Sequence, residues 1–265
     1  MDIITAVIAV TVIGLIVGVV LAIASIAFSV PKDEKAEKIL EILPGANCGA
    51  CGYSGCSGYA NALSKGEAKP GACTVGGEEV SDAISEFLGV SSEKSIKNVA
   101  IVMCVGDTNS TEKAIQYQGI KTCRDAKQIY SGGGKCTFGC LGYGDCIKAC
   151  EFNSIKICNG IANINMKTCY GCGGCKKVCP QKIIKIIPFK THTEVKCSNC
   201  DKGGETRKAC TAGCIGCMRC VKACEYGAIK VVNFNATVDY EKCVGCGKCV
   251  SECKNGCIIM IEGDK

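Results

Sequence analysis

Residues 210–224 read CTAGCIGCMRCVKAC, and residues 243–253 read CVGCGKCVSEC. The same pattern occurs 74 residues earlier without a gap, where residues 136–150 read CTFGCLGYGDCIKAC and residues 169–179 read CYGCGGCKKVC. Eight cysteines of one copy coincide with eight of the other. Such internal self-similarity indicates two copies of one structural unit in tandem.

The spacing of these cysteines predicts what each copy binds. The run C-x2-C-x2-C-x3-C is the ligand pattern of two-cluster bacterial ferredoxins, in which the fourth cysteine of a run binds the other cluster. Tyr143 stands where the second copy has Cys217, and Cys136 is the nearest substitute for the missing ligand. Four [4Fe-4S] ligand sets result: Cys136, Cys140, Cys146 and Cys179; Cys150, Cys169, Cys172 and Cys175; Cys214, Cys217, Cys220 and Cys253; Cys224, Cys243, Cys246 and Cys249.

A fifth set of cysteines precedes the repeat. Cys48, Cys51 and Cys56 follow the spacing C-x2-C-x4-C, and Cys73 comes after a Pro-Gly turn. Together they supply four ligands for one [4Fe-4S] cluster. The glycines between them let backbone N–H groups approach the sulfur atoms. Because C-x2-C pairs also build zinc ribbons, a zinc site remains the alternative at this position.

Seven cysteines lie outside these five sets. Cys158 aligns with Val232 of the other copy, and Cys257 aligns with Ile183. Both cysteines are therefore predicted to be small apolar core residues rather than ligands. A sixth cluster is left open against spare structural cysteines, with ligands drawn from Cys197, Cys200 and Cys210 together with Cys104 or Cys123.

Composition sets the compartment and the class of partner. The chain has 27 cysteines among 265 residues, and their regular runs suit an inorganic core better than a secreted disulfide scaffold. Thiolate-only clusters in such number require a reducing, anaerobic interior. The formal net charge of +6 leaves out the negative charge that each thiolate-ligated cluster adds. The apparent basicity therefore gives no reason to expect a nucleic acid partner.

The N-terminal segment has the composition of a membrane anchor. Residues 3–30 carry no charge, and roughly 20 apolar residues are enough for a spanning helix. Pro31 ends this segment, and Lys32, Lys35 and Lys38 follow it. Because positive flanks favour the cytoplasmic side, we expect a single-pass protein of the cell membrane with a cytoplasmic soluble domain.

The predicted fold class is α+β. We expect an anchor over residues 1–31, a small four-cysteine [4Fe-4S] domain over 32–90, a connecting region over 91–135, and ferredoxin modules over 136–190 and 191–265. Helices are predicted near 36–43 and 81–90, and strands over 98–104, 155–157, 183–187, 229–232 and 258–261. His192, the only histidine, lies in a polar stretch and is predicted to be exposed. No flavin, nicotinamide or catalytic motif is present.

The order of these parts resembles a known family. An uncharged segment, then PGANCGACGYSGC at residues 44–56, then GGGKCTFGCLGYGDC at residues 132–146 and tandem ferredoxin modules are similar to the B subunits of the Rnf complex. The resemblance implies an iron–sulfur component of an ion-translocating ferredoxin:NAD oxidoreductase. Such a protein takes electrons from reduced ferredoxin and passes them to membrane and peripheral subunits of the same complex.

Two other functions fit the same cysteine patterns. The chain could be the iron–sulfur wiring subunit of a different membrane redox enzyme, such as a hydrogenase or a quinone reductase. It could also be a structural zinc protein. Iron and labile sulfide content separates the zinc protein from the others, and the co-purified subunits separate the two electron carriers.

Overall fold

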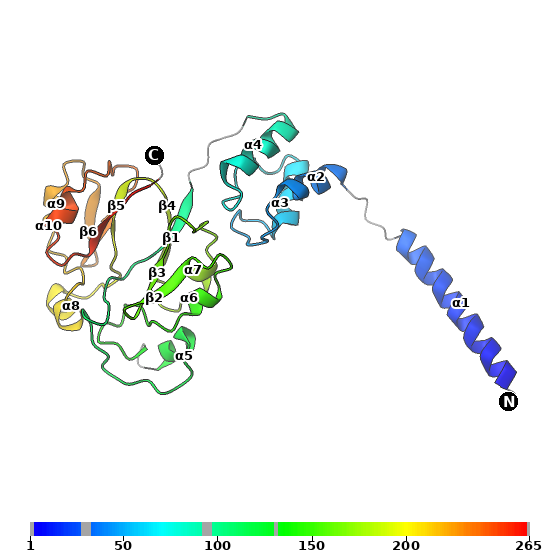
Figure 1. Cartoon of the computed structure of the whole chain (residues 1–265), viewed down its shortest axis with the longest axis horizontal. Helices are drawn as coiled ribbons and strands as arrows, with labels where there is room; N and C mark the ends of the chain where they lie inside the picture. The colour runs from blue at the N-terminus through cyan, green and yellow to red at the C-terminus, as the bar shows by residue number, and fades with distance from the viewer. Residues whose placement is uncertain (1–2, 28–32, 92–96, 130–131, 264–265) are drawn as a thin grey trace.

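The computed structural model describes residues 3–27, 33–91, 97–129 and 132–263 (Figure 1). Helix α1 (Ile3–Ala27) is 25 residues long and carries no charged residue. Its side chains are described at positions 7, 8 and 10–24, and the large ones are exposed. Within the described part of the chain, no helix meets the length and apolarity needed to cross a membrane. Pro31 and Lys32, expected to end the anchor, lie outside the described residues.

Three helices form the small N-terminal unit. They are α2 (Glu34–Ile42), α3 (Cys56–Ser64) and α4 (Gly77–Leu88). α2 and α4 overlap the helices predicted near 36–43 and 81–90, and α3 was not predicted. Asp33 caps α2 by accepting a hydrogen bond from the Lys35 amide at 3.0 Å. Ile39, Tyr59 and Ile84 pack in the centre of this unit and are almost wholly buried. The cysteine loops pack around this core, which holds them in place.

The two ferredoxin modules share one strand plan. In the first, β1 (Asn98–Val102) pairs antiparallel with β4 (Ile184–Pro188), and β2 (Ile155–Cys158) pairs with β3 (Ile161–Ile164). In the second, β5 (His192–Val195) pairs with β8 (Ile258–Ile261), and β6 (Ile229–Val232) pairs with β7 (Asn235–Val238). The short helices are α5 (Cys123–Gln128), α6 (Asp145–Lys148), α7 (Gly174–Val178), α8 (Gly203–Ala209), α9 (Arg219–Ala223) and α10 (Lys248–Glu252).

The strand register identifies which residues of the two modules are equivalent. Val102 pairs with Ile184, and Val195 pairs with Ile258. Ile258 follows Ile184 by the repeat distance, but Val195 follows Val102 by more, because the first module has a longer loop after its first strand. β1 is thus the counterpart of β5. We expected residues 91–135 to be a connecting region, but their strand β1 is paired within the first module, and we propose that this module begins at Asn98.

Two predictions of exposure and burial were wrong. His192 is wholly buried, and its ring packs edge-on against Tyr240 with centroids 4.8 Å apart, because it begins the paired strand β5. Cys158 is exposed at the end of β2. Its aligned partner Val232 is exposed too, with 47% of its surface accessible. An apolar residue at that position therefore does not indicate burial. Cys257, in contrast, is buried as predicted.

Candidate iron–sulfur sites

The cysteines of the N-terminal unit line one cavity. Cys48, Cys51, Cys56 and Cys73 all face it, as the spacing predicted. Asn47 shapes the loop, since its Oδ1 accepts a hydrogen bond from the Cys56 amide at 2.9 Å. The Gly76 amide donates to the Cys73 Sγ at 3.4 Å. Backbone donors of this kind stabilise a thiolate and tune a bound cluster.

Two cavities in the second module contain the two predicted sets. One cavity, of about 240 Å³, is lined by Cys214, Cys217, Cys220 and Cys253. The other is lined by Cys224, Cys243, Cys246 and Cys249. Thr193 supports this second set, because its hydroxyl lies 3.6 Å from the Cys243 Sγ and 3.4 Å from the Cys249 Sγ. Each set combines three cysteines of one run with the fourth of the other, as the exchanged-ligand rule requires.

One cavity of the first module contains a different cysteine from the one expected. It is lined by Cys123, Cys140, Cys146 and Cys179, whereas Cys136 lies elsewhere. Burial raises the pKa of Cys146 to about 12, and the negative charges of Cys140 and Cys123 act in the same direction. The structure thus places Cys123, rather than Cys136, where the second module has Cys217.

The position of Cys123 follows from the local structure of α5. Thr122 caps the helix by accepting a hydrogen bond from the Asp125 amide at 3.1 Å, which makes Cys123 the first helical residue. The Arg124 amide donates to the Asp145 side chain at 3.1 Å and so ties α5 to α6. The Cys123 thiol is buried beside the first cysteine set as a result. Sequence spacing gave no signal for this contact, because Cys123 aligns at the repeat distance with Cys197, which does not line the equivalent site of the second module.

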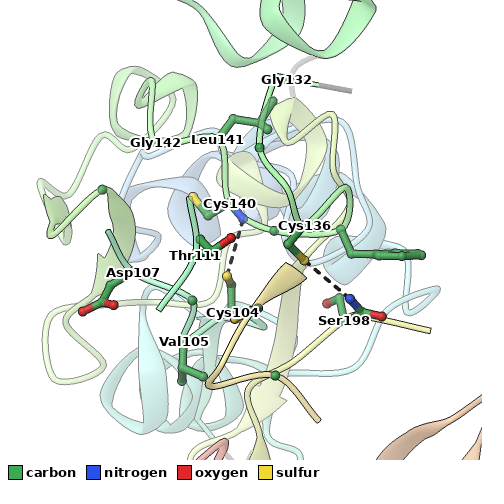
Figure 2. Close-up of a pocket in the computed structure, with 18 of the residues that line it drawn as sticks. Cys104, Val105, Asp107, Thr111, Gly132, Cys136, Cys140, Leu141, Gly142 and Ser198 are labelled. Atoms are coloured by element: carbon green, nitrogen blue, oxygen red, sulfur yellow. Dashed lines mark hydrogen bonds between the residues drawn. The ribbon is translucent and has the colours of Figure 1, made fainter. Parts of the chain in front are cut away.

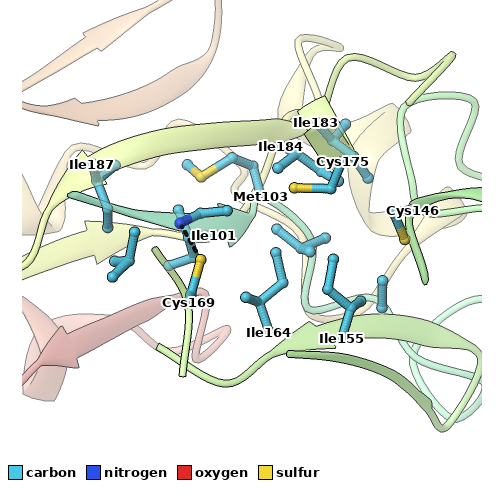
Figure 3. Packing of buried hydrophobic residues seen from close by; sticks show 14 of the residues in the cluster. Ile101, Met103, Cys146, Ile155, Ile164, Cys169, Cys175, Ile183, Ile184 and Ile187 are labelled. Carbon is cyan, nitrogen blue, oxygen red and sulfur yellow. Dashed lines mark hydrogen bonds between the residues drawn. The ribbon is translucent and has the colours of Figure 1, made fainter. Parts of the chain in front are cut away.

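The remaining predicted set of the first module consists of Cys150, Cys169, Cys172 and Cys175. Burial raises the pKa of Cys175 to about 12, and the charges of Cys169, Cys172 and Cys150 act in the same direction. The Ala100 amide, on β1, donates to the Cys169 Sγ at 3.3 Å. Figure 3 shows Cys169 and Cys175 within a core built mainly of isoleucines, including Ile101, Ile164 and Ile184. These apolar side chains keep water away from the cysteine set.

Glycines between the cysteines let the strands cover the sites closely. Gly142 and Gly216 are equivalent, and both have positive φ, +77° and +63°. A Cβ at Gly216 would lie 2.9 Å from the Phe234 carbonyl oxygen, and one at Gly142 would collide with the Gly160 carbonyl oxygen. The hairpins β2–β3 and β6–β7 therefore lie directly against the cysteine loops, where only glycine fits.

The chemistry of these sites fits iron–sulfur clusters. All 27 cysteines are free thiols, and no histidine is exposed to serve as a further ligand. Among the described residues, no three or more His, Cys, Asp or Glu side chains lie close enough to hold a single metal ion. The predicted ligand sets line shared cavities, and backbone N–H groups are directed at several of the sulfur atoms. Thiolate ligands in sets of four are those of a [4Fe-4S] cluster.

Comparison with known proteins identifies the family. Two family models match, one described as "Putative Fe-S cluster" over residues 43–75 and one as "4Fe-4S dicluster domain" over residues 213–257. The B subunit of the Na(+)-translocating ferredoxin:NAD(+) oxidoreductase complex of Acetobacterium woodii is 41% identical over 231 residues, which are 86% of this chain and 69% of that protein. The chain belongs to the family of Rnf-type B subunits.

Two further relatives agree with this assignment. The B subunit of the ion-translocating oxidoreductase complex of Methanosarcina acetivorans is 35% identical over 86% of this chain and 87% of its own length. The B subunit of the proton-translocating ferredoxin:NAD(+) oxidoreductase complex of Clostridium ljungdahlii is 36% identical over 77% of this chain and 72% of its own length. The relatives' names differ in the ion that is moved, so family membership alone leaves the ion open.

Proposed function

We propose that this chain is the electron-wiring subunit of a membrane ion-translocating ferredoxin:NAD oxidoreductase, and that it takes electrons from reduced ferredoxin. The proposal rests on the series of cavities along one chain, each lined by four or more cysteines. The clusters, when bound, supply one-electron uptake and release. The protein's own residues hold them, cover them with apolar strands and expose the two ends of the series to partners.

We propose that electrons pass between adjacent sites in sequence. Burial raises the pKa of Cys172, and the charge of Cys48 acts in the same direction, which supports an N-terminal site next to the Cys172 site. The charge of Cys175 likewise contributes to the raised pKa of Cys146, so the two sites of the first module are neighbours. These contacts support a path that begins or ends at the N-terminal unit, the part nearest α1 in the chain.

We further propose that α1 anchors the chain in the cell membrane. Its 25 residues lack any charge, and the exposed side chains include Leu15, Leu21 and Ile23. A soluble unit would bury apolar side chains of this size, whereas lipid can cover them. Tethering would hold the N-terminal site beside membrane partners, so that site is the proposed exit for electrons.

The opposite end of the series carries the proposed docking surface for ferredoxin. Lys222, Lys230, Lys242 and Lys248 are exposed on the second module, and Lys248 lines its last site. Exposed lysines attract an acidic partner. Lys248 is paired with Glu225 at 2.5 Å, and Lys242 lies 3.8 Å from Asp239. Both pairs are largely exposed, so they hold these lysines at the surface while adding little stability.

The test uses the full chain purified anaerobically in detergent. Mixing it with reduced ferredoxin, free of other reductant, is expected to bleach its visible absorption rapidly, and the rate is expected to fall as ionic strength rises. Absence of any bleaching would exclude ferredoxin as the donor and would favour the wiring subunit of a hydrogenase or quinone reductase. Co-purification of the other membrane subunits tests the assignment to the complex.

A further inference from the structure

Four cysteine thiols outside the other sites line a cavity between the two ferredoxin modules. The cavity has a volume of about 160 Å³, and Cys104, Cys136, Cys197 and Cys210 all contribute to its wall. Figure 2 shows Cys104 and Cys136 directed into this space, next to Cys140. Cys158 and Cys200, which belong to no set, are exposed and lie outside it.

Two glycines show that these thiols face one another. A methyl group added at Gly106 would lie 2.9 Å from the Cys210 Sγ and 3.8 Å from the Cys104 Sγ. One added at Gly139 would lie 3.7 Å from the Cys136 Sγ and 3.8 Å from the Cys104 Sγ. Three thiols from distant parts of the sequence thus converge around backbone that has no side chain to fill the space.

The four thiols form two equivalent pairs. Cys104 comes two residues after β1 and Cys197 two residues after β5, and these strands are counterparts by register. Cys136 and Cys210 are related by the sequence repeat. The pairs also share their hydrogen bonds: the Cys140 amide donates to the Cys104 Sγ at 3.5 Å, and the equivalent Cys214 amide donates to the Cys197 Sγ at 3.3 Å.

Further donors and packing complete the wall of the cavity. The Asn199 side chain, itself 1% exposed, lies with its Nδ2 3.6 Å from the Cys136 Sγ. Asn235 holds the segment that carries Asn199, because its Nδ2 donates to the Asn199 carbonyl at 2.8 Å and to the Cys197 carbonyl at 3.0 Å. N–H groups directed at sulfur are the arrangement that stabilises thiolate ligands.

We propose that Cys104, Cys136, Cys197 and Cys210 hold a sixth [4Fe-4S] cluster, which bridges the two ferredoxin modules. Each module supplies two of its ligands. This inference rests on the proposed function, because the cluster would lie between the first-module sites and the second-module sites of the electron path. Cys140 lines both this cavity and a first-module site, and Gly213 lines both this cavity and a second-module site.

The bridge has a simple role in electron transfer. An electron that enters on one module leaves from the other, so one electron arrives at the bridge and one departs, with no bond made or broken. The ligand set also explains the exchange of cysteines in the first module. Cys123 completes that module's own site, which leaves Cys136 to join Cys210 in the bridge.

Iron content of the full chain tests the bridge. With four irons a cluster, the anaerobically purified chain is expected to hold about 24 iron atoms, and Cys104→Ser or Cys210→Ser about 20. Cys200→Ser, the matched control, is expected to stay at about 24. Spin integration of the reduced proteins by electron paramagnetic resonance should fall by one cluster in the two ligand variants alone.

A second variant keeps every thiol in place. Gly106→Ala would push its methyl group against the Cys210 Sγ, so it is expected to lose the same cluster, while Gly204→Ala, with open space around it, keeps all six. Unchanged iron in Cys104→Ser, Cys210→Ser and Gly106→Ala, or one bound zinc in place of four irons, would overturn the bridge and leave the other sites standing. Little iron or sulfide in the unaltered chain would instead overturn the proposed function.

Discussion

The two ferredoxin modules use the same strands to hold different ligand sets. The second module follows the spacing rule throughout, and Cys217 completes its first site. The first module has Tyr143 at that position, with its ring against Tyr117 at 5.9 Å, and Cys123 from α5 occupies the site instead. A lost ligand can therefore be replaced from an unrelated segment, provided that the fold brings a thiol to the same cavity.

The largest effect is expected from removing the replacement ligand. Cys123→Ser should lose the cluster at the site lined by Cys123, Cys140, Cys146 and Cys179. The change should also destabilise the first module by several kcal/mol, because cluster binding and folding are coupled. Adding Tyr143→Cys to Cys123→Ser should restore the cluster, since it recreates the ligand that the second module has. Iron content and thermal unfolding measure both effects. Failure of the double variant to regain iron, when Cys123→Ser alone has lost it, would show that the two modules differ by more than one ligand.

The second-largest effect is expected from substituting the two equivalent glycines. Gly142→Ala and Gly216→Ala each force an L-residue to positive φ and press a methyl group against a hairpin, so each should cost about 1–3 kcal/mol of unfolding free energy. Gly142→Ala should cost more, because its clash is closer. Gly256→Ala, at φ +64° in open space, is the matched control for strain alone and should cost about 1 kcal/mol. Equal losses in all three variants would mean that close packing of the hairpins plays no part.

A smaller effect is expected where the modules differ in the core. Cys257 is buried at the position equivalent to Ile183, and its Sγ lies 3.5 Å from the Cys253 Sγ. Cys257→Val, a smaller change in volume than Cys257→Ile, should therefore keep every cluster and change the unfolding free energy by less than about 1.5 kcal/mol. Iron content distinguishes the roles: a loss of four irons would make Cys257 a ligand and would remove the equivalence with Ile183.

The smallest effect concerns the surface of the second module. Lys222→Gln and Lys248→Gln should slow reduction by ferredoxin severalfold at low salt and very little at high salt, because screened charges steer weakly. Lys176→Gln and Lys177→Gln, on α7 of the first module, are the matched controls and should leave the rate unchanged. Stopped-flow absorption measures all four. A rate that depends on the first-module lysines instead would move the ferredoxin docking site to the first module.

The sequence predicted well whatever depends on local spacing. In the structure, the residues that the spacing rule named line one cavity for the N-terminal set and one for each second-module set. The strands over 229–232 and 258–261 were also predicted correctly, because each is a short β-branched run.

What the sequence missed depends on contacts between distant segments. Cys123 and Cys197 lie one repeat distance apart, yet the strand register makes Cys104 the counterpart of Cys197. The longer loop after β1 conceals this equivalence from any fixed offset. The polar surroundings of His192 in the sequence likewise gave no sign of the strand pairing that buries it.

Six clusters on one chain can be tested by quantifying iron, labile sulfide and zinc in the anaerobically purified full chain. We expect about 24 iron and about 24 sulfide for each chain, with almost no zinc. A value near 20 would leave an electron-transfer protein without the bridge. Stoichiometric zinc with little sulfide would contradict the account, because cysteine sets that hold single zinc ions cannot carry electrons between partners.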